Sequence, residues 1–354
     1  WNAILVGNEG QGLHNGWVVK NNIVENWHCY GIELTNIKNS SVTGNLVRQG
    51  INTTTCSNQD IGILIQSQQL PQGVGGTVKN VKVDNNDVSG SLNRSGIELL
   101  AWDATNSKIS KLQDILISNN KVNKVFRGIF IFSIGSNANI SDVNISENIL
   151  KGNFHGIQFT DSGGGTHSSI NIIKNNISDS IGTTSGIRLT PGTSAVGITI
   201  NSNNIVNNAL FGINHGGTGT LNAKLNWWGN ESGPGGIGPG TGDSISANVA
   251  YSPWLGLPVG TVPMTYGVDN SSSIQEVIDL ANDGDTINVG NGTYTESIKI
   301  NKSLTLIGTG YSSTTVIDTN GFSAINITTD GVVIDGFDIK FFGTHAIMIK
   351  EVDN

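Results

Sequence analysis

The side chains with the most chemical potential gather near one position of a repeating pattern: His155, Gln158, Asp161 and Arg188. Glycoside hydrolysis needs two carboxylates that face one groove, and a lyase needs a cation site and a basic residue beside its substrate. This group offers one carboxylate, and the sequence contains no dense cluster of aspartates. We therefore expect a mixed, solvated face at this position and assign no catalytic residue.

Other acids and histidines are too scattered to predict a metal site or a cofactor. Glu33 and Glu98 occupy the same repeat position, but the repeat that carries Leu64 separates them. The acids that could bind calcium are Asp330, Asp335 and Asp338, which resemble turn and strand-edge residues. The six histidines, His14, His28, His155, His167, His215 and His345, share no ligand spacing. Calcium is the one metal ion for which the sequence offers candidate ligands.

The cysteines and glycosylation sequons favour an extracellular or cell-surface location. Cys29 and Cys56 are about one repeat apart, so they predict either a disulfide or two separate buried thiols. The Asn-x-Ser/Thr sequons lie at Asn39, Asn52, Asn93, Asn139, Asn144, Asn176, Asn230, Asn270, Asn291, Asn301 and Asn326. Few thiols, few methionines and a polar, uncharged surface point the same way.

Composition excludes several classes of protein. The 354 residues include 47 Gly and 45 Asn, whereas charged residues make up 13%. Helical proteins use few such residues, because Gly and Asn are poor helix formers. With 19 Lys+Arg and a net charge of −8, nucleic acid is not an expected partner. No apolar run reaches the ~18–20 residues of a membrane span.

Two short motifs alternate along the first two thirds of the chain and must position these side chains. The first is Gly-Ile-x-apolar, which begins at Gly31, Gly62, Gly96, Gly128, Gly156, Gly186 and Gly212. The second centres on Asn22, Asn45, Asn86, Asn120, Asn148, Asn176, Asn204 and Asn226. Because strand side chains alternate faces, each Ile points inward and its neighbour outward. One such strand per coil predicts a parallel β-solenoid, with the asparagines at the bends as turn formers and ladder members.

These motifs resemble the right-handed parallel β-helix superfamily, the pectate-lyase-like or parallel β-helix repeat proteins, over about residues 1–256. Residues 225–234 and 251–255 resemble the terminal segment of β-helix domains on surface proteins, such as the adhesin-like proteins of methanogenic archaea. In that interpretation Trp227, Trp228, Tyr251 and Trp254 cover the open apolar end of the coil. The alternative is a stacking platform for sugar rings.

A second domain is predicted after a linker at residues 257–270. Ser273 and Glu276 form a capping box, and Ile274, Val277 and Ile278 share one face of a helix over about 273–282. Short strands follow. Residues 271–354 therefore resemble the amino-terminal cap and first coils of a second β-helix, so the expected fold is all-β with one short capping helix.

The sequence predicts an extracellular structural protein that assembles with copies of itself into a filament, sheath or surface layer. Strand pattern without a cap at Trp1, Ile4, Val6, Ile347 and Ile349 suggests head-to-tail contact between copies, or one period of a longer tandem chain. A truncated multi-domain protein is the remaining interpretation. The functional alternatives are an adhesin that binds cell-wall or extracellular polysaccharide, and a polysaccharide lyase, hydrolase or epimerase.

Overall fold

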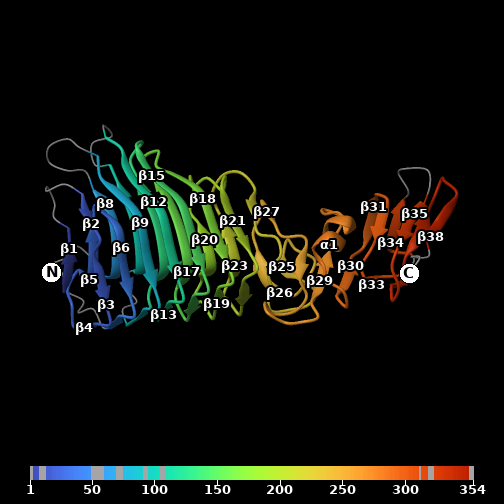
Figure 1. The fold of residues 1–354 in the computed structure, drawn as a ribbon, viewed down its shortest axis with the longest axis horizontal. Coiled ribbons are helices and arrows are strands. Elements are labelled where there is room, and N and C mark those ends of the chain that lie inside the picture. The colour runs from blue at the N-terminus through green and yellow to red at the C-terminus, as the bar shows by residue number, and fades with distance from the viewer. Residues whose placement is uncertain are drawn as a thin grey trace. The chain divides into compact units, whose positions relative to one another are not determined.

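The computed structural model describes residues 3–7, 13–48, 60–68, 75–90, 95–103, 108–310, 312–317 and 323–350. The chain divides into two compact units. The first comprises Trp1–Ala223, Gly235–Gly238 and Asp243–Ala250, and the second comprises Lys224–Pro234, Pro239–Gly242 and Tyr251–Asn354. Figure 1 shows the parallel strands of each unit.

Three sheets, built mainly of parallel strand pairs, form the first unit. One follows the order β1 (Ile4–Val6), β5 (Tyr30–Thr35), β8 (Ile61–Gln68), β11 (Ser95–Trp102), β14 (Arg127–Ile134), β17 (His155–Ser162), β20 (Ser185–Leu189), β23 (Phe211–His215), β26 (Gly242–Ile245) and β25 (Pro234–Gly236). The second comprises β4 (Ile23–Glu25), β7 (Leu46–Arg48), β10 (Asp87–Ser89), β13 (Lys121–Asn123), β16 (Ile149–Lys151), β19 (Asn176–Ser178) and β22 (Asn204–Val206).

The third sheet comprises β2 (His14–Asn15), β6 (Ile37–Thr43), β9 (Thr77–Asp84), β12 (Ser110–Ser118), β15 (Ala138–Ser146), β18 (Thr166–Ile173), β21 (Ile198–Asn201), β24 (Leu221–Asn222) and β27 (Val249–Ala250), with β3 (Val18–Lys20) beside β6. The chain visits the three sheets in turn, once per coil. The predicted fold class, an all-β right-handed parallel β-helix, is confirmed.

The predicted isoleucine stack forms the core of this unit. The isoleucines that follow the motif glycines pair in register from coil to coil and are fully buried: Ile32, Ile63, Ile97, Ile129, Ile157, Ile187 and Ile213. Because β-branched side chains pack well on a pleated strand, one residue type can fill this position in every coil.

An asparagine ladder runs beside the core, but two members differ from the prediction. Each side-chain amide donates to the carbonyl oxygen of the asparagine one coil further on, at 2.9–3.0 Å, through Asn22, Asn45, Asn86, Asn120, Asn148, Asn175 and Asn203. The motif had placed Asn176 and Asn204 in this ladder. Those asparagines instead begin β19 and β22, and Asn176 is exposed.

The second unit is a shorter coil stack with a helix at its start. Its strands are β28 (Trp254–Leu255), β29 (Thr265–Val268), β30 (Thr286–Val289), β31 (Gly292–Thr295), β32 (Ile298–Ile300), β33 (Thr305–Gly308), β34 (Thr314–Ile317), β35 (Ser323–Ile327), β36 (Val333–Asp335), β37 (Asp338–Lys340) and β38 (His345–Ile349). All pairs are parallel except β28 with β29. No helix among the described residues is long and apolar enough to cross a membrane.

Helix α1 (Ile274–Leu280) buries Ile274, Val277 and Ile278, as the sequence predicts. Ser273 caps it by accepting a hydrogen bond from the backbone N–H of Glu276. The apolar face of the helix joins the core of the second unit, so it plugs the start of this coil stack.

The boundary between the units differs from the predicted one. Residues 225–234 and 251–255 belong to the second unit, because Trp227 and Leu255 pack with its core. The predicted linker, residues 257–270, contains β29, which pairs with β30. The single-sequence pattern did not reveal which core these apolar side chains join.

Candidate functional site

A groove lies on the outer face of the first sheet of the first unit. Its lining residues are Phe126, Arg127, Phe130, Phe132, Gln158, Thr160, Arg188 and Thr190, and its volume is about 550 Å³. We call it the arginine groove. Two rows of outward side chains form it, because Phe130, Gln158 and Arg188 are register partners on β14, β17 and β20. Phe132 and Thr160 pair in the second row.

Aromatic rings hold Arg127 at one side of the groove. The rings of Phe130 and Phe132 stack with centroids 4.9 Å apart, as alternate residues of one strand can. The Arg127 guanidinium carbon lies 4.3 Å from the ring centroid of Phe130 and 4.8 Å from that of Phe126. Cation–π attraction therefore restrains this side chain and leaves a positive charge beside an apolar surface.

A second cation, Arg188, lies beside a neutral histidine. Its Nη1 atom is 3.3 Å from Nε2 of His155, which is 3% exposed. Burial, and then the charges of Arg188 and Arg127, lower the pKa of His155 to about 4. His155 is thus uncharged at neutral pH. Within the described part of the chain, Arg188 has no ion-pair partner, so its charge is available to a ligand.

Gln158 lines the same groove and has an unpaired acceptor. Its Nε2 donates to the hydroxyl of Thr160 at 3.2 Å, whereas its Oε1 is buried and accepts no hydrogen bond. The side chain is 5% exposed. Because buried carbonyl oxygens are normally paired, this atom of a groove-lining residue lacks a donor.

The outward column is not the mixed, solvated face that the sequence predicts. Glu33, Leu64, Glu98, Phe130 and Gln158 are all buried. The two glutamates accept hydrogen bonds from neighbouring side chains of the same face. These side chains are buried because long side chains two residues apart on one strand, or at the same position of adjacent coils, cover each other.

Two residues of the predicted cluster, Gln158 and Arg188, line the groove. His155 contacts Arg188 but, like Asp161, is absent from the lining. Burial alone would raise the pKa of Asp161, yet hydrogen bonds from His167 and Ser133 hold it below its usual range. This carboxylate therefore belongs to a separate network.

Sequence reasoning missed the phenylalanines and Arg127. The available signal was the run Phe130-Ile131-Phe132, in which apolar residues occupy the outward positions of a strand as well as the inward one. An outward aromatic pair is unusual for a solvated face.

The four aromatic residues predicted as a cap or sugar platform lie in the second unit. Trp228 is fully buried, and Trp227 packs against the core of the second unit. The Tyr251 hydroxyl donates to Asp269 at 2.6 Å, and Trp254 Nε1 donates to the Glu231 carbonyl at 3.0 Å. Both the cap and the sugar-platform interpretations of these four residues stay predictions.

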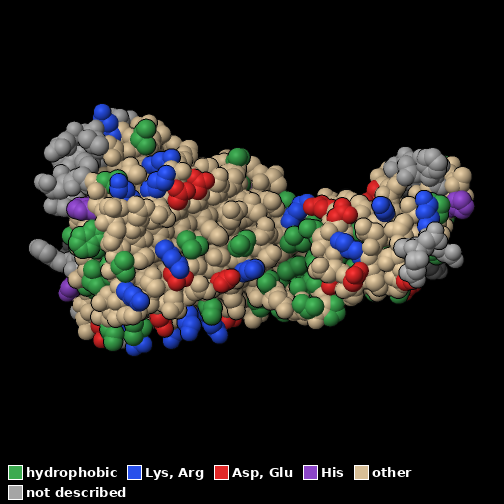
Figure 2. All heavy atoms as spheres, in the orientation of Figure 1, with side chains coloured by type: hydrophobic (Ala, Val, Ile, Leu, Met, Phe, Trp, Pro, Cys, Tyr) green, Lys and Arg blue, Asp and Glu red, His purple; other side chains and the backbone are tan. Residues whose placement is uncertain are grey.

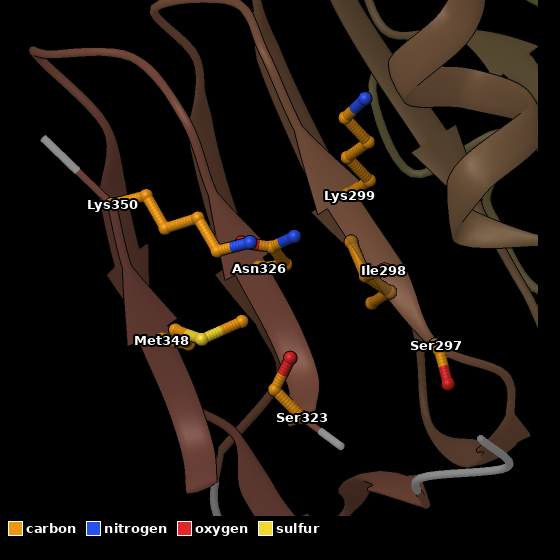
Figure 3. Close-up of a pocket in the computed structure, with 7 residues that line it drawn as sticks. All are labelled: Ser297, Ile298, Lys299, Ser323, Asn326, Met348 and Lys350. Carbon is orange, nitrogen blue, oxygen red and sulfur yellow. The ribbon is translucent and has the colours of Figure 1, made fainter. Parts of the chain in front are cut away.

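The sequons differ in exposure. Asn39, Asn176, Asn270, Asn291 and Asn301 are exposed, whereas Asn139, Asn144, Asn230 and Asn326 are partly buried. Asn326 lies in a second pocket, between Lys299 and Met348 on the neighbouring coils, with Lys350 beside it (Figure 3). Asn52 and Asn93 lie outside the described residues. Glycosylation stays a prediction.

Several other hypotheses also stay predictions. Cys29 is not a free thiol, but Cys56 lies outside the described residues. Trp1 does too, whereas β1 contains Ile4 and Val6, and β38 contains Ile347 and Ile349; their pairings do not test contact between copies. The described residues contain no group of three or more His, Cys, Asp or Glu arranged to hold a metal. Asp338 pairs with Lys340 at 3.6 Å.

Comparison with known proteins adds little. No family model and no curated protein matches the chain. Among solved structures, the chain is similar to a mutant of a PL6-family alginate lyase, with 12% identity, 100% of this chain and 72% of the other covered, and a TM-score of 0.18. A likeness at this level does not extend that enzyme's activity to this chain.

Proposed function

We propose that the first unit binds an acidic polysaccharide in the arginine groove. The observation that carries this proposal is that a cation without an ion-pair partner and a hydrogen-bond acceptor without a donor occupy adjacent positions. Arg188 has a positive charge without a described ion-pair partner, and Gln158 has a buried carbonyl oxygen without a donor. A uronic acid residue supplies both groups, since it carries a carboxylate next to hydroxyls.

Each wall of the groove has a role in this proposal. The uronate carboxylate pairs with the fork of N–H groups on Arg188, and a sugar hydroxyl donates to Gln158 Oε1. Thr160 and Thr190 supply further hydroxyls at the rim. The apolar face of the sugar ring packs on Phe132 and Phe126, whose rings line the groove.

A polymer suits the groove better than a single sugar. The lining comes from consecutive coils, which repeat at about 4.8 Å, so one chain of sugars contacts several coils. Individual contacts of this kind contribute only about 1 kcal/mol each, and affinity comes from their sum. Polysaccharide binding agrees with an extracellular or cell-surface location and with the adhesin alternative, which we propose together.

We propose binding rather than a reaction. The described lining of the groove contains no pair of carboxylates of the kind that glycoside hydrolysis uses. The nearby acid, Asp161, is engaged by His167 and Ser133. Figure 2 shows Lys, Arg, Asp and Glu scattered among uncharged side chains on the face in view.

Calorimetric titration with oligouronates tests the proposal, with neutral oligosaccharides of equal length as the reference ligands. Wild-type protein should prefer the oligouronates. Arg188→Gln should weaken their binding about tenfold or more, because a charge-assisted pair is worth about 1.5–3 kcal/mol. The matched control is Arg48→Gln, an exposed arginine on β7 of the same unit. Equal loss in both variants, or no preference for uronates, would contradict the proposal.

A further inference from the structure

The second unit contains a larger cavity of different chemistry, with a volume of about 640 Å³. The carboxyl ends of β29, β30 and β33 form one wall, and residues of the segments 231–239 and 254 form the other. We infer that this amide cavity is a second saccharide site, specific for neutral oligosaccharides. The inference is independent of the arginine groove, since the two sites share no residue.

Uncharged hydrogen-bonding groups converge on the amide cavity. Asn270 and Asn288 both line the cavity, and among the described residues neither side chain has a hydrogen-bond partner elsewhere. Asn291 follows β30 and accepts a hydrogen bond from the hydroxyl of Thr309, which follows β33. An amide offers a donor and an acceptor together, and sugar hydroxyls need both. Three amides at one cavity therefore match a hydroxyl-rich ligand.

The apolar part of the cavity fits the CH faces of a sugar. In register, Gly267, Asn288 and Ile307 occupy one outward row on β29, β30 and β33. Ile307 is 38% exposed, and the Trp254 indole lies over Gly267, where an added Cβ would come within 2.1 Å of the ring. Since Trp254 is itself 5% exposed, it contributes a wall and not an open stacking surface.

Charge separates this cavity from the arginine groove. Its described lining contains two carboxylates, Glu231 and Asp269, and neither Lys nor Arg. Asp269 accepts hydrogen bonds from the Tyr251 hydroxyl and from both the backbone and the hydroxyl of Ser271. Unneutralised carboxylates repel an anionic sugar but accept hydrogen bonds from a neutral one.

The experiment uses full-length protein from a bacterial host without N-glycosylation, because a glycan on Asn270 or Asn291 would itself fill the cavity. The probes are cellohexaose, xylohexaose, mannohexaose and laminarihexaose, measured by calorimetry and saturation-transfer NMR. At least one should bind. Asn270→Ala combined with Asn288→Ala should weaken that binding about tenfold, because two hydrogen bonds are lost, and should leave oligouronate binding unchanged.

Two further variants make the result decisive. Thr286→Ala is the matched control, because Thr286 lies two residues before Asn288 on the same face of β30 and outside the cavity lining. Ile307→Trp should block the cavity at an exposed position and abolish neutral-sugar binding. The inference is overturned if none of the four probes binds, or if the asparagine and Ile307 variants bind the neutral sugar as wild type does. If the wild-type protein binds the neutral sugar but not the oligouronates, the proposal for the arginine groove is overturned and this inference stands.

Discussion

At the scale of single residues, the asparagine ladder distinguishes neighbours that look alike in sequence. Asn148 is fully buried, accepts hydrogen bonds from the backbone N–H and the side-chain amide of Asn120, and donates to Asn175 and to two backbone carbonyls. Asn176 is exposed. The two asparagines should therefore differ in their contribution to stability. A buried polar group that loses its hydrogen-bond partner is not compensated for its lost hydration.

We therefore expect Asn148→Ala to lower the free energy of unfolding by about 2–4 kcal/mol, since it leaves several buried groups unpaired. Asn176→Ala should change it by no more than about 0.5 kcal/mol. Urea titration of both variants measures the difference. Equal effects would show that the ladder does not run through Asn148.

His155 predicts a pH dependence of stability. Its pKa is about 4 in the folded protein, below the ordinary value of 6.5, because it is buried beside cations. Between these values the unfolded chain binds a proton that the folded protein does not. The stability contributed above pH 6.5 is therefore lost as the pH falls toward 4. His155→Gln should lose less stability across this interval in urea titrations; the same pH slope in both proteins would contradict the assignment.

Residue-level prediction succeeded where a position repeats and failed where it depends on neighbours. The inward isoleucines were predictable because each coil repeats them beside a glycine. Asn175 was distinguishable from Asn176, because Ile172 and Ile177 give Asn175 the same apolar spacing as the other ladder members, whereas Asn176 has Ser178 two residues on. The sequence placed Gln158 and Arg188 together on successive coils, but it did not predict that Phe126, Arg127 and Phe132 would line a groove beside them.

At the scale of elements, α1 is held at both ends by the coil that follows it. Glu296 accepts hydrogen bonds from the Ser273 hydroxyl and from the backbone N–H groups of Ile274 and Gln275. The Lys302 ammonium donates to three carbonyls at the other end of the helix, at 2.7–2.9 Å. Acid at the amino end and base at the carboxyl end both complement the helix dipole.

Glu296→Ala should destabilise the second unit by about 1.5–3 kcal/mol, because it removes charge-assisted hydrogen bonds from the first turn of α1. Asp330→Ala, an exposed acid in the same unit, is the control. Thermal unfolding followed by circular dichroism compares them. If Glu296→Ala melts with the control, Glu296 does not hold the helix.

The strand register makes a further prediction at this scale. Ile129 on β14 is fully buried, whereas Ile149 on β16 is 43% exposed. Ile129→Asp should cost about 3–5 kcal/mol or more, because it buries an unpaired charge. The same substitution at Ile149 should be tolerated. Denaturant unfolding of the two variants checks the register, and a normal midpoint for Ile129→Asp would exclude it.

At the scale of the whole molecule, the sequence predicted the fold class and the short helix but misplaced the boundary between units. The alternation of the two motifs is a local pattern, so a single sequence is enough to reveal it. Membership of Trp227 and Leu255 in a core is a three-dimensional property, and the same apolar pattern fits the end of one coil stack or the start of the next. The functional proposals likewise rest on side chains gathered from separate coils.

A crystal structure of the full chain with a bound oligouronate tests the central claim most directly. The account predicts that the ligand lies across β14, β17 and β20, with a carboxylate on the guanidinium of Arg188 and a hydroxyl hydrogen-bonded to Gln158 Oε1. An arginine groove that stays empty at saturating ligand, or a ligand bound elsewhere on the chain, would contradict it.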